Sequence, residues 1–154
     1  MPERVPTASG QSRAVTVEEY RQLLGVRSGL RRFLRWSEDR ANENGLTATQ
    51  HQLLLAIKGH DDERGPTIGE VAYYLALKHN SVVGLIDRAD AACLIYRYTD
   101  AADRRIVRLG LTPEADRRLA ALSALHLEEL ARLAPEIESI WHDLGGFRKP
   151  RSAI

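Results

Sequence analysis

The sequence predicts a mainly α-helical fold that carries a small two- or three-stranded β sheet. Three segments, which begin at Thr16, Thr47 and Thr67, place a Glu or Gln three residues after a threonine. In this capping box the hydroxyl and the acid or amide satisfy backbone N–H groups at the start of a helix. Apolar residues then follow at helical spacing, whereas residues 94–109 change to a period of about two, which is typical of short strands.

Three helices are expected in the first half of the chain. The first runs from Val17 to Asn44, because apolar side chains recur along it and Gly45 follows as a terminator. The second spans residues 48–58. After a polar loop at 59–66, a short third helix covers residues 68–75.

The second half predicts a helix, a hairpin and a long C-terminal helical region. The fourth helix covers residues 80–91, and strands follow at 94–98 and 106–109, joined by a projecting polar loop. Thr112-Pro113-Glu114 then starts a helical stretch to Leu144, which we expect to break at Pro135 because proline disrupts helix interiors. Its apolar positions exceed what one small domain needs, which favours a dimer.

This order of elements is that of a winged helix-turn-helix with helices added at both ends. We expect a DNA-binding lobe at residues 47–111 between dimerisation helices at 16–46 and 112–147, with loose tails at 1–15 and 148–154. The formal net charge is only +1, but residues 21–40 hold six arginines against two acids, so a near-neutral chain can still present a basic face. One cysteine, no secretory signal and no run of about 20 apolar residues predict a cytoplasmic protein without a membrane segment.

Four segments in register resemble the multiple-antibiotic-resistance regulator family, MarR. They are LTATQ from residue 46, TIGEVAYYLAL from 67, SVVGLIDRADAACLI from 81 and DAADRRIVRLGLT from 100. The resemblance covers residues 16–144. It implies a homodimer that binds pseudo-palindromic operators in double-stranded DNA, regulates transcription and is released by a small-molecule effector. We expect a repressor, and not an enzyme, since no catalytic motif is present.

The candidate DNA-binding residues lie in the fourth helix and the hairpin loop. A helix fits the major groove, and arginine suits the narrow minor groove. The candidates are Lys78, His79, Asn80, Ser81 and Arg88 in the helix, and Asp103, Arg104 and Arg105 in the loop, with Asp103 orienting one arginine. The alternatives are that Asn80 or Ser81 only caps the helix, and that the loop is a solvated charged run.

Two positions depart from the family pattern. Val83-Gly84 stands where the family often has Thr-Arg, which removes an arginine contact and puts the target sequence in doubt; a glycine inside a helix suggests a packing or contact reason. Cys93 stands where the family has a glycine at the helix end. A left-handed backbone is unfavourable for cysteine, so we expect a different turn and a small semi-buried structural residue.

The sequence also contains candidate residues for a ligand pocket and for a metal site. Arg35, Trp36 and His51 are the candidates to hold an aromatic anion, although Trp36 and His51 also suit ordinary packing. His60-Asp61-Asp62 and the pair His126 and Glu129 match no metal-ligand spacing, so neither a metal nor a cofactor is expected. A protein-interaction module without DNA affinity and a metal sensor remain the alternatives to a DNA-binding regulator.

Overall fold

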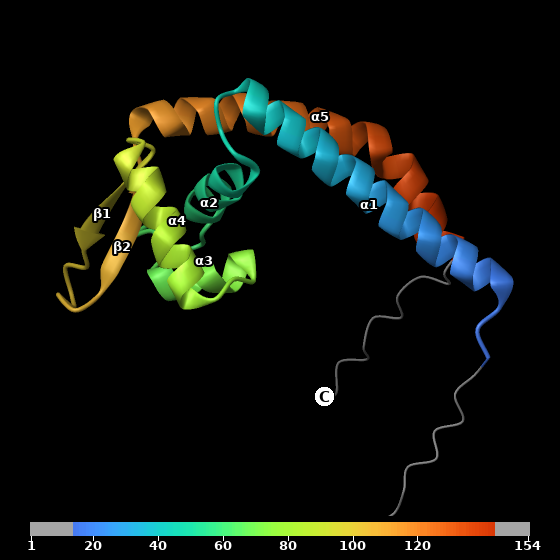
Figure 1. The fold of residues 1–154 in the computed structure, drawn as a ribbon, viewed down its shortest axis with the longest axis horizontal. Helices are drawn as coiled ribbons and strands as arrows, with labels where there is room; N and C mark the ends of the chain where they lie inside the picture. Colours follow the sequence, from blue (N-terminus) through green and yellow to red (C-terminus); the bar gives the residue numbers. More distant parts are fainter. Residues whose placement is uncertain (1–13, 144–154) are drawn as a thin grey trace, which may run out of the picture. The chain divides into compact units, whose positions relative to one another are not determined.

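A computed structural model describes residues 14–143 of the chain (Figure 1). The described residues divide into two compact units. One unit comprises residues 32–134, and the other comprises residues 14–31 together with 135–143. Leu144, the tail at 148–154 and most of the tail at 1–15 lie outside the described residues.

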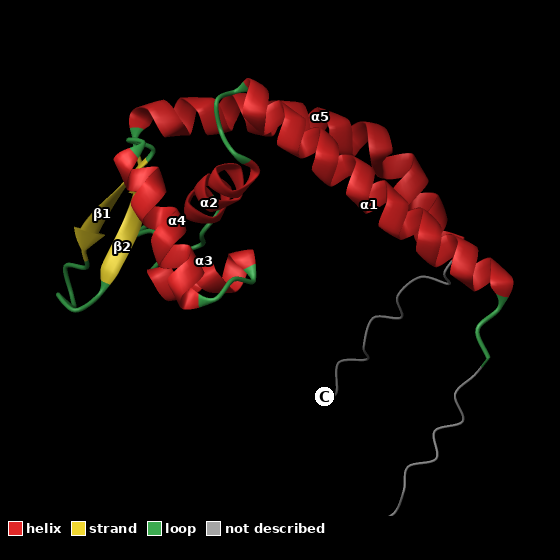
Figure 2. Ribbon diagram, in the orientation of Figure 1, coloured by secondary structure: helices red, strands yellow, loops and turns green. Residues whose placement is uncertain are grey.

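The expected fold class is confirmed: the chain is mostly helical and carries one antiparallel hairpin (Figure 2). The helices keep the predicted order, and most of their ends differ from the prediction by no more than one residue. The elements are α1 (Val17–Glu43), α2 (Ala48–Lys58), α3 (Ile68–Leu75), α4 (His79–Ala91), β1 (Ile95–Thr99), β2 (Val107–Leu111) and α5 (Pro113–Asp143).

The predicted helix starts are confirmed by their hydrogen bonds. Thr47 with Gln50 and Thr67 with Glu70 form complete capping boxes at α2 and α3. At α1 the backbone N–H of Thr16 donates to Glu19 (2.8 Å), and the Glu19 N–H donates to the Thr16 hydroxyl (3.2 Å). These contacts need only residues three apart in the chain, which is why the sequence alone could predict them.

The predicted break at Pro135 is wrong, because α5 is one helix from Pro113 to Asp143 with Pro135 inside it. Proline removes a single N–H donor and crowds one carbonyl of the preceding turn, which weakens a helix without necessarily ending it. Its 31 residues supply many other hydrogen-bonded turns to offset that loss.

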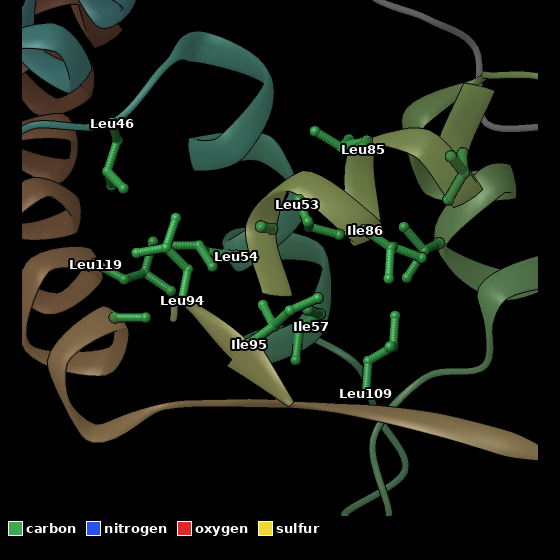
Figure 3. Packing of buried hydrophobic residues seen from close by; sticks show 14 of the residues in the cluster. Leu46, Leu53, Leu54, Ile57, Leu85, Ile86, Leu94, Ile95, Leu109 and Leu119 are labelled. Carbon is green, nitrogen blue, oxygen red and sulfur yellow. The ribbon is translucent and has the colours of Figure 1, made fainter. Parts of the chain in front are cut away.

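The core of the 32–134 unit lies where α2, α3 and α4 meet one face of the hairpin (Figure 3). Leu53, Leu54 and Ile86 are fully buried there against Leu109 of β2. Burial of the apolar face of α4 fixes its rotation, so the opposite face of the helix is exposed.

The hairpin pairs Ile95 with Leu111 and Thr99 with Val107. A single bridge joins Thr67, at the start of α3, to Arg108, and the Leu109 N–H donates to the Pro66 carbonyl (3.0 Å). The sheet is therefore two strands with one added bridge. Both strands begin one residue later than predicted, because Leu94 belongs to the turn after α4.

The expectation of a different turn at Cys93 is wrong. Cys93 adopts a left-handed backbone with φ 56° and is exposed, not semi-buried. The Leu94 N–H donates to the Ala89 carbonyl (3.0 Å) and the Cys93 N–H to the Asp90 carbonyl (2.9 Å), which is the Schellman pattern that usually carries glycine. Leu94, the residue after Cys93, is buried. Its burial holds the turn in the left-handed conformation, although cysteine disfavours that conformation.

Candidate nucleic-acid interface

The N-terminal turn of α4 presents an unused polar surface. α4 begins at His79 rather than Asn80, and its N-cap, Lys78, makes no side-chain cap hydrogen bond. Asn80 and Ser81 therefore do not cap the helix. Lys78, His79, Asn80 and Ser81 are all exposed, and none of their side chains has a hydrogen-bond or ionic partner among residues 14–143.

Further along α4, the two acids near Arg88 are engaged by the hairpin. Arg97 of β1 donates to Asp87 and lies 3.6 Å from a carboxylate oxygen of Asp90. Arg88 itself is exposed and makes no ion pair with any residue that the structure describes. The acids thus anchor the hairpin to α4 and leave Arg88 free.

The loop between β1 and β2 separates the roles of its two arginines. Asp103 accepts hydrogen bonds from the Arg105 backbone N–H (3.0 Å) and from its Nε (3.0 Å) and guanidinium terminus (2.8 Å). These bonds lower the pKa of Asp103. Arg104 is exposed and has no partner within the described part of the chain, so Asp103 orients Arg105 and leaves Arg104 available.

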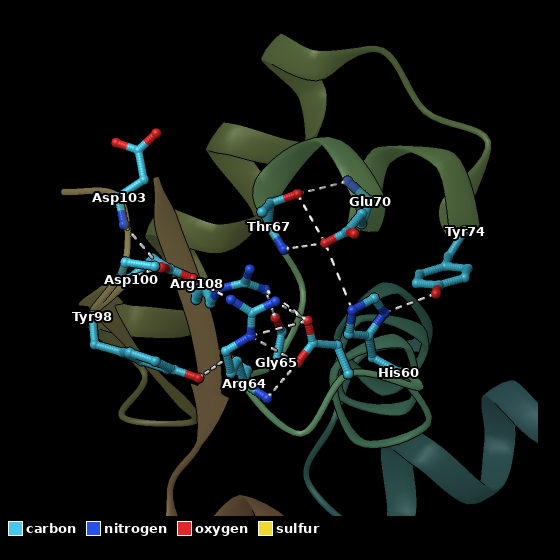
Figure 4. Close-up of polar contacts among 12 residues, drawn as sticks. His60, Arg64, Gly65, Thr67, Glu70, Tyr74, Tyr98, Asp100, Asp103 and Arg108 are labelled. Carbon is cyan, nitrogen blue, oxygen red and sulfur yellow. Dashed lines mark hydrogen bonds and ion pairs between the residues drawn. The ribbon is translucent and has the colours of Figure 1, made fainter. Parts of the chain in front are cut away.

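A buried ion pair holds the base of this loop (Figure 4). Arg108 donates through Nε to Asp100 and through a terminal nitrogen to the Gly65 carbonyl (2.7 Å). Asp100 also accepts from the backbone N–H groups of Ala102 (2.8 Å) and Asp103 (3.1 Å). The Arg108 contact, and then these N–H groups, lower the pKa of Asp100 to about 2.

The 59–66 loop is bound to the same base. Arg64 pairs with Asp62 (2.7 Å), and the Tyr98 hydroxyl donates to the Arg64 carbonyl. Gly65 has φ +74° and lies against the Leu109 carbonyl, where a Cβ would come within 2.4 Å. The sequence predicted only a polar loop here; the alternation of acids and arginines could not show which pairs form across the hairpin.

The expected ligand residues are only partly brought together. Trp36 and His51 both contact His126, with ring centroids 4.9 and 4.8 Å apart, whereas Arg35 is exposed and unpaired among the described residues. His126 donates from Nδ1 to the Leu122 carbonyl (2.8 Å), and its Nε2 lies 2.6 Å from the Ser37 hydroxyl. Burial, and then His126, lower the pKa of His51.

The metal-like clusters are occupied by internal contacts. His60 Nδ1 lies 2.8 Å from the Tyr74 hydroxyl, and Glu129 pairs with Arg132 (2.6 Å). Across residues 14–143, no three His, Cys, Asp or Glu side chains are grouped so that they could hold a metal ion. Within the same range, no helix has the length and apolarity that a membrane crossing requires.

Comparison with known proteins points to one family. Residues 44–106, which include α2, α3, α4 and β1, match the model of the MarR family. A curated relative from Bacillus subtilis, the uncharacterized HTH-type transcriptional regulator YsmB, is 43% identical over 51 residues. That match covers 33% of this chain and 35% of YsmB, so it spans only about a third of the relative.

Solved structures share the fold over a longer stretch. AbsC, a MarR family transcriptional regulator from Streptomyces coelicolor, superposes with a TM-score of 0.68 at 18% identity, covering 82% of this chain and 84% of AbsC. The MepR–DNA complex from S. aureus gives a TM-score of 0.63 at 21% identity, covering 86% of this chain and 96% of MepR. Residues 44–106 therefore carry the sequence pattern of the MarR family, and the chain shares its fold with MarR-family transcription regulators.

Proposed function

We propose that the chain is a homodimeric, sequence-specific DNA-binding repressor. One observation carries the proposal: a single compact unit exposes Lys78, His79, Asn80 and Ser81 on α4 and Arg104 on the hairpin loop, with their polar atoms unused inside the described chain. Elsewhere in the unit, by contrast, most arginines are paired with acids. Free polar side chains on a helix and a neighbouring loop suit a polyanion with readable base edges.

The two parts of this surface suit the two grooves of a duplex. The start of α4 would enter the major groove, where Asn80 can pair with adenine and uncapped N–H groups can approach phosphates. Arg104 would enter the minor groove, where the negative potential is strongest. Arg105, oriented by Asp103, would contact the adjacent DNA backbone. The Asp100–Arg108 ion pair would hold the loop between β1 and β2 in a fixed position.

The dimer is supported by apolar side chains that are exposed in the single chain. Tyr20 and Leu24 of α1 are 61% and 66% exposed, and Leu127 of α5 is 68% exposed. Contact with a second copy would remove this surface from water. Two copies could then place two α4 helices in successive major grooves, about 34–36 Å apart.

The test is a titration of DNA binding at two salt concentrations. A duplex selected from a randomised pool by the full chain serves as the probe, because the operator is unidentified. Arg104→Ala with Arg105→Ala should weaken binding at least about tenfold and flatten its salt dependence, since counterions released at phosphates set that slope. The matched control, Arg117→Ala with Arg118→Ala, removes two arginines of α5 that pair with Glu114, outside α4 and the hairpin, and should change affinity by less than about twofold.

Three results would contradict the proposal or part of it. Failure to recover any duplex would favour a protein-interaction module with the same fold. Equal affinity for the double loop variant and the wild type would remove the hairpin from the binding surface. Loss of DNA affinity on addition of a chelator would instead indicate a metal sensor.

Release by a small aromatic anion is the finer part of the proposal. Its support is the exposed Arg35, which has no partner within residues 14–143, next to Trp36, which contacts His126 beside His51. Benzoate should weaken DNA binding by the wild type, and Arg35→Ala should abolish that response while leaving affinity without benzoate unchanged. A response that persists in Arg35→Ala would place the anion elsewhere.

A further inference from the structure

Gly84 lies in the middle of α4, where glycine weakens a helix relative to alanine. Its backbone is ordinary helix, so no positive φ requires glycine. Residues four apart share a helix face, so Gly84 follows Asn80 by one turn and precedes Arg88 by one turn. The face that carries these three residues is opposite the buried Val82, Leu85 and Ile86.

The nearest atom to the empty side of Gly84 belongs to Arg88. A Cβ built on Gly84 would lie 3.4 Å from the Arg88 terminal nitrogen Nη1, and no other described atom beyond its chain neighbours and the adjacent helix backbone lies within 4 Å. Long side chains in a helix lean toward its N-terminus and cover the preceding turn. Arg88 therefore extends back along α4, and its guanidinium lies over Gly84, on the side of Asn80.

Nothing in the described chain competes for this guanidinium. Asp87 and Asp90, its nearest acids in sequence, both engage Arg97 on the hairpin. The Arg88 side chain is exposed and, within residues 14–143, makes no hydrogen bond or ion pair. A guanidinium that lies over a helix surface and has no partner there is available to a ligand on that face.

We propose that Gly84 and Arg88 act as one specificity-determining unit, in which the missing side chain at 84 lets the Arg88 guanidinium read a guanine next to the base pair read by Asn80. A planar guanidinium donates two parallel hydrogen bonds to guanine O6 and N7 in the major groove. Arg88, one turn further along the helix, thereby replaces the arginine that the family often has at position 84. This inference rests on the proposed DNA binding.

A competing explanation is that glycine only lets the α4 backbone approach the DNA. The two explanations differ in what a side chain at position 84 does once Arg88 is removed. If Arg88 occupies the space beside Gly84, a new side chain at position 84 weakens DNA binding only while Arg88 is present. If the duplex occupies that space, the new side chain weakens DNA binding whether or not Arg88 is present.

A double-mutant cycle tests this with the full chain and the duplex that it selects from a randomised pool. Gly84→Leu and Arg88→Ala should each weaken binding at least about tenfold, and their combination should be no more than about threefold weaker than Arg88→Ala alone. Arg88→Lys keeps the charge but lacks the planar fork, so it should lose the preference for one G·C pair while keeping the salt dependence. Leucine favours helix over glycine, so the thermal midpoint of Gly84→Leu should not fall.

The outcomes separate this inference from the proposed function. If the wild type selects no duplex, DNA binding itself fails. If it selects one and the two substitutions multiply independently, Gly84 and Arg88 are not a unit. If Arg88→Ala weakens binding equally for every sequence, Arg88 contacts phosphate, and the assignment to a base is overturned. The pair Arg88→Ala and Arg104→Ala is the control, since these distant sites should act independently.

Discussion

Cys93 shows how one residue can occupy a backbone conformation that its own chemistry disfavours. Its left-handed φ of 56° brings Cβ close to backbone atoms, which costs an L-residue roughly 1–2 kcal/mol. The hydrogen bonds of the Schellman turn and the burial of Leu94 hold it there. The chain therefore carries local strain at the junction between α4 and β1.

Cys93→Gly should relieve that strain. We expect the free energy of unfolding to rise by about 0.5–1 kcal/mol, because the relieved strain exceeds the added entropy of the unfolded chain. Urea denaturation under reducing conditions measures it. Cys93→Ala keeps the Cβ and should change stability by less than about 0.5 kcal/mol. A gain in Cys93→Ala equal to that in Cys93→Gly would show that the thiol, not the backbone, is responsible.

At the same scale, the sequence predicted contacts that close within a few residues and missed those that close across the fold. Thr47 and Gln50 are three residues apart and can form their hydrogen bonds independently of the tertiary fold, so the capping box could be predicted. Arg108 reaches Asp100 and Gly65 only after the hairpin and the 59–66 loop have come together. The position of Arg88 over Gly84 was missed for a different reason: the departure at 84 was visible, but the direction of the arginine was not.

Among the elements, the hairpin depends on an ion pair whose titration is predictable. The pKa of Asp100 falls from 3.8 to about 2 because Arg108 and two backbone N–H groups favour its charged form. A group whose pKa is lower in the folded state contributes stability above its unfolded pKa and loses that contribution as the pH falls through the folded value. The contribution of Asp100 should therefore disappear between about pH 4 and pH 2.

Asp100→Asn should remove this part of the acid sensitivity. Thermal midpoints measured from pH 5 to pH 2 should fall less steeply for the variant than for the wild type, and the variant should be less stable at pH 5. Asp61→Asn, on the exposed part of the 59–66 loop, is the control and should keep the wild-type slope. Parallel pH curves for Asp100→Asn and the wild type would exclude Asp100 as the titrating group.

α5 carries a weak point at Pro135, where the two compact units meet along the chain. Since proline removes a hydrogen bond and crowds the preceding turn, Pro135→Ala should raise the free energy of unfolding by about 1–3 kcal/mol. Calorimetry of the full chain measures this change. The neighbouring substitution Glu136→Ala should change stability by less than about 0.5 kcal/mol. A lower midpoint for Pro135→Ala would mean that the proline is required for packing.

At the scale of the whole molecule, the sequence predicted the order of the helices and the hairpin because these elements follow from local patterns. The surplus of apolar residues along α5 could also be seen in the sequence. The structure divides these residues into buried and exposed groups. Leu119 and Leu122 are buried in the 32–134 unit, whereas Leu127 and Leu130 remain exposed. Only the structure could make that division, because the spacing of leucines is the same for a core and for an interface.

The exposed leucines lead to a prediction about assembly. Leu127 and Leu130 are three residues apart on α5 and share one face of the helix. If a second copy covers them, Leu127→Glu with Leu130→Glu would bring four carboxylates into one apolar contact, where burying unpaired charge is costly.

The double variant should then be monomeric by light scattering at concentrations at which the wild type is dimeric. Its affinity for the selected duplex should fall at least about tenfold, because one lobe must bind without the second. Ala121→Glu adds a carboxylate at an exposed position of α5 that is not three or four residues from Leu127 or Leu130, and it should leave both properties unchanged. A dimer that survives in the leucine variant, with its DNA affinity intact, would show that these residues lie outside the contact between copies.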